Sequence, residues 1–112
     1  MTRDDFKCPC CGANEISDDL VKRLQGIEVE CHVKLHINSG FRCEKHNKEI
    51  RGEDASSHLV GLAADVSCNY SGLRMYLINY GLAAEIDRIG IGKSFIHFDI
   101  DTTKPRDVIW LY

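Results

Sequence analysis

The first long pattern in the chain is an apolar stripe at helical spacing. Leu20, Leu24, Ile27 and Cys31 follow one another at intervals of four, three and four residues, which is typical of an amphipathic helix. Ser17 stands just before the stripe, where a serine hydroxyl caps a first turn well. The pattern therefore predicts a helix that ends near residue 31.

A second period overlaps the end of this helix. From Ile27 to Ile37 every other residue is apolar, and strict alternation is typical of a half-buried strand. We therefore expect a strand over residues 33–38, broken at Ser39-Gly40. The charged stretch that follows is expected to hold a short helix over residues 44–50.

The rest of the chain combines one more helical pattern with several short β-type runs. Ser71 is expected to cap a second main helix and Gly81 to end it. Strands are expected over residues 62–66, 88–91, 95–100 and 108–111. Helices and strands do not alternate strictly, so the predicted fold class is α+β.

The length and net charge of the chain argue for a single domain and against several classes of partner. The chain has 112 residues, of which 44% are hydrophobic and 28% charged, and this supports a single domain over residues 1–112. A net charge of −3 argues against a nucleic-acid partner. No apolar run approaches the roughly 20 residues of a membrane span, and the polar N-terminus does not resemble a secretory signal. We expect a soluble monomer, cytoplasmic as synthesised and without stable membrane association.

Six cysteines in so short a chain raise the question of metal or disulfides. Cys8 and Cys11 form a CxxC followed by glycine, which resembles one knuckle of a zinc ribbon, within an N-terminal segment (residues 1–16) expected to pack on the domain. Cys43-x-x-His46 is the candidate for a second knuckle, so a structural zinc ion at Cys8, Cys11, Cys43 and His46 is one interpretation. Free buried thiols or a disulfide are favoured over it.

The segment richest in chemistry is SxHxxGxAxD, residues 56–65, which places His58 and Asp65 in an otherwise small or apolar run. A carboxylate in such a run must be paired or ligated. A second cluster puts His97 and Asp99 on one face of a strand, because residues two apart point the same way. Two histidines and one carboxylate that converge would hold zinc with its fourth position open to water.

These motifs resemble the zinc D-alanyl-D-alanine carboxypeptidase family. Its wider superfamily includes vancomycin-resistance dipeptidases, phage L-alanyl-D-glutamate endolysins and the hedgehog signalling domain. Four blocks match in order: residues 6–12; INSGFR of residues 37–42 with His46-Asn47; SxHxxGxAxD; and GIG followed by FIHFD. The closest likeness is to short, single-domain prophage-type members. The resemblance implies a small antiparallel sheet packed with two main helices.

The resemblance also implies roles for individual residues. His58, Asp65 and His97 match the zinc ligands, Arg42 matches the arginine that binds a substrate carboxylate, and Ser56 matches a substrate-side serine. The implied activity is hydrolysis of cell-wall peptidoglycan peptides, by a D-Ala-D-Ala carboxypeptidase or an L-Ala-D-Glu-type endopeptidase. Release during phage lysis would bring a cytoplasmic product to that substrate.

The general base departs from the family pattern. Many superfamily members carry an acid three residues before the last zinc histidine, where this chain has Ser94. Asp99 is the candidate base, and an equal alternative is that it orients a ligand or an arginine. Asp101 and Glu85 are weaker candidates for the base.

Three other functions remain open at the level of sequence. Two histidines and a carboxylate also describe a non-haem iron site, although no histidine follows His97. A hedgehog-type binding module would keep the zinc site without catalysis. A zinc-ribbon nucleic-acid module at Cys8 and Cys11 is disfavoured by the acidic balance.

Overall fold

Helix α1 (Asp18–Cys31) forms where the apolar stripe predicts it in the computed structural model, which describes residues 1–112. The Ser17 hydroxyl accepts a hydrogen bond from the backbone N–H of Leu20 (3.3 Å), so the predicted N-cap is confirmed. The helix ends at His32, whose φ of 54° lies in the left-handed region. Leu20, Leu24 and Ile27 of its apolar stripe are buried in the core of the molecule, and the half-buried Cys31 packs against this core.

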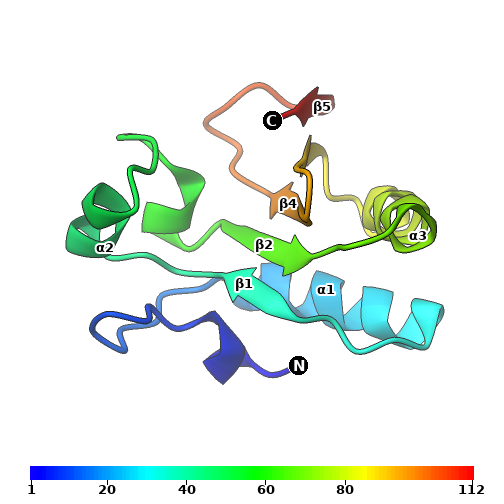
Figure 1. Ribbon diagram of the computed structural model, residues 1–112, viewed down its shortest axis with the longest axis horizontal. Helices are drawn as coiled ribbons and strands as arrows, with labels where there is room; N and C mark the ends of the chain where they lie inside the picture. The colour runs from blue at the N-terminus through cyan, green and yellow to red at the C-terminus, as the bar shows by residue number, and fades with distance from the viewer.

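A five-stranded sheet forms the centre of the molecule. Its strands are β1 (Ile37–Ser39), β2 (Ala63–Ser67), β3 (Arg88–Ile91), β4 (Phe95–Asp99) and β5 (Val108–Leu111). The spatial order is β1-β2-β4-β3-β5, and all pairs are antiparallel except β3 with β5. Figure 1 shows β1, β2, β4 and β5 in this order from the lower part of the view to the top. The α+β class is confirmed, with one parallel pair added to the expected antiparallel sheet.

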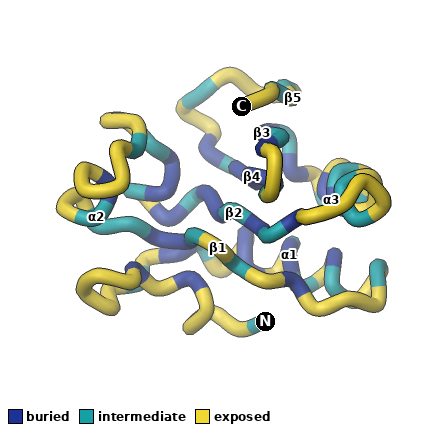
Figure 2. Tube along the Cα trace, viewed as in Figure 1, coloured by how far each residue is buried: buried dark blue, intermediate teal, exposed yellow.

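The two faces of the sheet have different surroundings. One face carries Ala64 and Val66 of β2, Ile89 of β3, and Ile96 and Phe98 of β4, which share the core with α1 and with α3 (Ser71–Ala83). Figure 2 shows this buried layer along the central strands, with exposed residues in the outer loops. Because side chains alternate along a strand, the residues between these five point to the opposite face. That second face carries the polar residues considered below.

Short elements connect this sheet to the N-terminal segment. A 3₁₀ turn, η1 (Arg3–Phe6), buries Phe6, whose carbonyl accepts a hydrogen bond from the N–H of Phe41 (2.8 Å). Helix α2 (Glu44–Glu49) matches the short helix expected over residues 44–50. A second 3₁₀ turn, η2 (Ser57–Val60), precedes β2. The N-terminal segment is thereby fixed against the end of β1.

The predicted boundaries of the second main helix are wrong. Tyr70, and not Ser71, is the N-cap of α3, and the helix continues through Gly81 to Ala83. A Cβ on Gly81 would lie 2.6 Å from the ring of Phe98, closer than real Cβ contacts. This glycine therefore lets the helix approach β4 and does not end it.

The predicted strand over residues 33–38 is also too long. Only Ile37–Ser39 form β1. The N–H of Leu35 donates to the carboxylate of Glu28 (2.8 Å) instead of to a neighbouring strand. Leu35 itself is buried in the core. The alternating pattern thus spans the end of α1 and a loop that buries Leu35. Contact with β2 begins at His36, whose carbonyl accepts the N–H of Ser67 (2.9 Å).

The helices of the structure are short relative to a bilayer. None of them is long and apolar enough to cross a membrane.

Candidate metal centre

The polar face of the sheet brings the sequence motifs together through strand register. Asp65 of β2 is paired with His97 of β4, and His97 is paired with Gly90 of β3. Gly90 is paired in turn with Trp110 of β5. Asp65 and His97 therefore lie side by side, although 32 positions separate them in the sequence.

His58 reaches the same place from the turn η2. The hydroxyl of Ser56 accepts a hydrogen bond from the backbone N–H of His58 (3.2 Å) and so caps this turn. The Nδ1 atom of His58 lies 2.7 Å from the carbonyl oxygen of Gly40, and its Nε2 atom lies 3.4 Å from Oδ1 of Asp65. In the hydrogen bond with Asp65, Nε2 carries a proton and donates to the carboxylate. Loss of that proton, with Nδ1–H still donating to Gly40, would leave the lone pair of Nε2 free for a metal ion.

Asp65 lies between the two histidines. Its Oδ1 atom is 2.8 Å from Nδ1 of His97, and its Oδ2 atom is 3.3 Å from Nη2 of Arg42. Burial alone would raise the pKa of this carboxyl, but hydrogen bonds with His58 and His97 outweigh burial and hold the pKa well below its usual range. Asp65 is therefore an ionised carboxylate at neutral pH.

His97 is held on both sides by carboxylates. Its Nδ1 atom faces Asp65, and its Nε2 atom lies 3.1 Å from Oδ2 of Asp99. Burial opposes the charged form of the ring, but the hydrogen bonds with the two carboxylates prevail and raise the pKa of His97. Two acids around one histidine provide the negative charge that a bound cation would neutralise.

The donor atoms fit a zinc ion. Nitrogen atoms of His58 and His97 and a carboxylate oxygen of Asp65 all lie within 4.8 Å of one another. Ligands at about 2.0–2.1 Å in a tetrahedral site stand about 3.3 Å apart, close to the 3.4 Å between His58 Nε2 and Asp65. The remote nitrogen of each ring has an oxygen partner, Gly40 for His58 and Asp99 for His97, as is usual for metal-bound histidines. The geometry supports the ligand set that the motifs predict.

Asp99 is enclosed by partners. It is 1% exposed; its Oδ2 atom faces His97, and its Oδ1 atom accepts the backbone N–H of Asp101 (2.8 Å) and lies 3.3 Å from Nε of Arg88. Burial would raise the pKa of Asp99, but the hydrogen bond with His97 and the neighbouring groups outweigh burial and lower it. The surroundings are those of a carboxylate that orients a histidine and an arginine.

A cavity of about 510 Å³ opens beside the three donors, and both predicted substrate residues line it. Arg42 donates to Oγ of Ser39 (2.9 Å) and to Oδ1 of Asn47 (3.3 Å), besides its contact with Asp65. Ser56 lines the wall as the cap of η2. Asp101 and Glu85, the weaker candidates for the base, do not line this cavity, whereas Glu53 does.

Two aromatic residues at the site were missed at the sequence level. Trp110 and Tyr112 line the cavity, with ring centroids 5.5 Å and 6.3 Å from that of His97. A Cβ on Gly90 would lie 2.7 Å or less from both side chains, so this glycine leaves the room they occupy. Arg88 stacks over Trp110 at 5.2 Å. The signal available was the alternation of Trp110 and Tyr112, which places both on one strand face.

The cysteine expectation needs one correction. Cys8, Cys11 and Cys43 do converge, but the fourth member of the cluster is Cys10, and His46 is outside it. Cys43 is the N-cap of α2, and its sulfur accepts the backbone N–H of His46 (3.4 Å). His46 therefore serves the cluster with its backbone and not with its ring.

Asp101 stabilises the turn η2 through a hydrogen bond from Ser57. Its carboxylate accepts hydrogen bonds from Ser57 Oγ (2.9 Å) and from the N–H and hydroxyl of Thr103. Burial would raise its pKa, but these bonds outweigh burial and lower it. A lowered folded-state pKa stabilises the protein above the unfolded pKa of about 3.9, and this contribution is lost as pH falls through the folded-state value.

We expect Asp101→Asn to lower the free energy of unfolding by about 1–3 kcal/mol near neutral pH. The difference from the unsubstituted protein should shrink below about pH 4. Urea unfolding at both pH values checks this, with exposed Asp54→Asn as the control. An equal difference at both pH values would contradict the ionised, hydrogen-bonded state of Asp101.

Comparison with known proteins finds one family match, which extends over most of the chain. No curated protein matches the sequence. Residues 2–99 match the family described as Peptidase M15, a span that includes all three donors, Arg42 and Ser56 and ends at Asp99. With this match, the chain belongs to the M15 family of peptidases.

Proposed function

We propose that this protein is a zinc-dependent peptidase that hydrolyses peptide bonds in bacterial cell-wall peptidoglycan. Family membership supports a peptidase. The observation that carries the metal is the convergence of His58, Asp65 and His97 at an open cavity, with each imidazole anchored through its remote nitrogen. The motif resemblance supports peptidoglycan as the substrate, and a phage endolysin is one setting in which the protein would meet it.

The metal and its donors have separate tasks in this mechanism. Zinc held by His58, Asp65 and His97 would supply a Lewis acid for the scissile carbonyl and would lower the pKa of the attacking water. His58 presents Nε2 because the Gly40 carbonyl holds its other nitrogen, and His97 presents Nδ1 because Asp99 holds its Nε2. Asp65 would contribute the negative charge that holds a dication.

The general base is the carboxylate that can take a proton from the attacking water, so it must be accessible from the cavity. Asp99 was expected as the base, but both of its oxygens have partners, so we infer that it orients His97 and Arg88. Glu53 is exposed and is the other carboxylate that lines the cavity outside the donor set. In the proposed mechanism Glu53 takes the proton from the attacking water and passes it to the leaving amine.

Arg42 is proposed to bind a substrate carboxylate. Its guanidinium donates to Ser39, Asn47 and Asp65 at the cavity wall. Two of its five N–H groups remain to donate to a substrate carboxylate. Ser56 lies at the same wall. A free D-Ala terminus would suit this arrangement, which favours carboxypeptidase cleavage, while a groove across the wall would allow internal cleavage.

Arg42→Lys tests this role because it keeps the charge and removes the fork. We expect kcat/KM for peptides ending in free D-Ala-D-Ala to fall about 10- to 100-fold, the value of hydrogen bonds to a charged group. The same peptides with an amidated end should be poor substrates for both proteins and lose little more in the variant. An equal fractional loss on acid and amide peptides, at unchanged metal content, would place Arg42 outside substrate recognition.

A hedgehog-type binding module is the second candidate, favoured by Ser94 at the position where many superfamily members carry an acid. The two functions differ in what purified cell-wall peptides become. Incubation with the zinc-loaded protein, followed by mass measurement of the products, should give fragments shortened at one defined bond. Intact peptides at several pH values, with zinc bound, would favour the binding module.

A further inference from the structure

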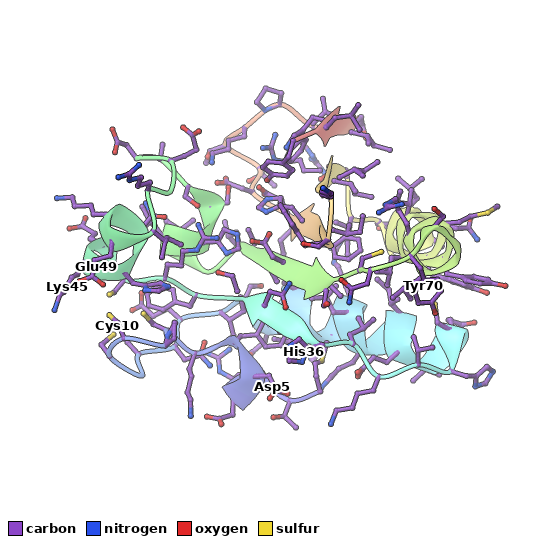
Figure 3. All side chains as sticks on the ribbon, viewed as in Figure 1. Asp5, Cys10, His36, Lys45, Glu49 and Tyr70 are labelled. Atoms are coloured by element: carbon purple, nitrogen blue, oxygen red, sulfur yellow. The ribbon has the colours of Figure 1, made fainter.

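Four thiols gather in a cluster outside the lining of the cavity. Cys10 and Cys11 are exposed, Cys8 is buried and Cys43 is half-buried. The Cys43 sulfur lies 3.3 Å from that of Cys10 and 3.6 Å from that of Cys8, and the sulfurs of Cys8 and Cys10 are 3.8 Å apart. Figure 3 shows Cys10 on the N-terminal loop beside the end of the molecule that carries α2.

This spacing fits a tetrahedral metal site. Four sulfurs at about 2.3 Å from a tetrahedral zinc ion stand about 3.8 Å apart, whereas a disulfide requires about 2.05 Å. All four sulfur ligand atoms lie within 4.8 Å of one another, and all four thiols are free. Coordination by all four would leave no open position for water.

The backbone holds the four thiols in place from two directions. In the N-terminal loop, the N–H of Cys8 donates to the carbonyl of Ala13, and the N–H of Gly12 donates to the carbonyl of Cys8, both at 2.8 Å. Cys43 is fixed as the N-cap of α2. The loop and the helix are 35 positions apart in sequence at their Cys8–Cys43 contact. Such anchoring keeps the four donors together before any ion is bound.

We propose that Cys8, Cys10, Cys11 and Cys43 bind a structural zinc ion that fastens the N-terminal loop to the start of α2. Four thiolates are a soft donor set suited to zinc, and each thiol loses its proton on coordination. The ion is separate from the one at His58, Asp65 and His97. Because Arg42 directly precedes Cys43, the site also steadies the segment that carries the substrate arginine.

Metal content tests the proposal in the whole protein. After purification under reducing conditions with zinc, native mass spectrometry should find two ions per chain. Cys10→Ser should retain one ion, His97→Ala should retain one, and the double variant none. Cys11→Ser gives a second exposed substitution, and Cys31→Ser, outside the cluster, is the matched control with two ions.

A spectroscopic readout assigns each ion to its ligands. With cobalt in place of zinc, His97→Ala should keep the thiolate-to-cobalt charge-transfer band and Cys10→Ser should lose it. The proposal is overturned if Cys10→Ser keeps the full metal content, or if the denatured, metal-free protein shows fewer than six free thiols. If the unsubstituted protein binds one ion only, and Cys10→Ser loses it while His97→Ala keeps it, the result supports this proposal and counts against the peptidase site.

Discussion

Replacement of His97 by alanine is expected to remove one metal ion and to lower peptide hydrolysis by about a thousandfold or more, because the Lewis acid supplies several kcal/mol of transition-state stabilisation. His97 lies 2.8 Å from Asp65 through Nδ1, so its loss opens the donor set. Its side chain lies on the sheet face opposite the apolar core, and the fold should persist. Metal content and turnover of cell-wall peptides are the measurements.

His36→Ala is the matched control, because His36 is an exposed histidine outside the cavity. It should keep both metal content and turnover. His58→Ala should behave like His97→Ala, since the two rings face the same carboxylate. Full metal content together with full turnover in either ligand variant would remove the basis for the metal centre.

Asp99→Asn is expected to weaken zinc binding about 10- to 100-fold, the usual cost of losing a carboxylate that orients a metal-bound histidine. The asparagine can no longer offer a charged acceptor to Nε2 of His97, and Arg88 loses its ion-pair partner. Activity at limiting zinc should fall by a similar factor, and excess zinc should restore most of it. Zinc affinity and turnover as a function of free zinc are the measurements.

Glu53→Gln is the companion to Asp99→Asn. It should bind zinc normally and still lose about 10²- to 10⁴-fold in turnover, as expected for loss of a general base. The reverse outcome is equally informative: Asp99→Asn inactive at saturating zinc and Glu53→Gln fully active. That result would return the base to Asp99 and contradict its assignment as an orienting residue.

Much of this site is predictable from the sequence because its residues lie in one alternating strand pattern, FIHFD, and one motif, SxHxxGxAxD. Strict alternation in FIHFD placed His97 and Asp99 on one face, and their side chains do lie in contact. SxHxxGxAxD placed His58 before a strand that carries Asp65, as observed. What it could not give was the pairing of β2 with β4, which depends on contacts between distant segments.

The features that escaped prediction depend on packing between such segments. Gly81 resembles a helix stop until Phe98 is placed against it. A knuckle pattern along the chain indicates His46 and not Cys10, whereas the cluster is assembled from two distant segments. The enclosure of Asp99 likewise depends on Arg88 from the neighbouring strand and on Asp101 beyond it. A one-dimensional pattern carries no information on these contacts.

The most direct test of the central claim is anomalous diffraction at the zinc absorption edge from crystals of the zinc-loaded protein. The account predicts a peak about 2.0–2.2 Å from Nε2 of His58, Nδ1 of His97 and an oxygen of Asp65. In the same crystals Asp99 should stay hydrogen-bonded to Nε2 of His97. A zinc-loaded crystal with no peak between these three residues, or with zinc bound through Nε2 of His97, would contradict it.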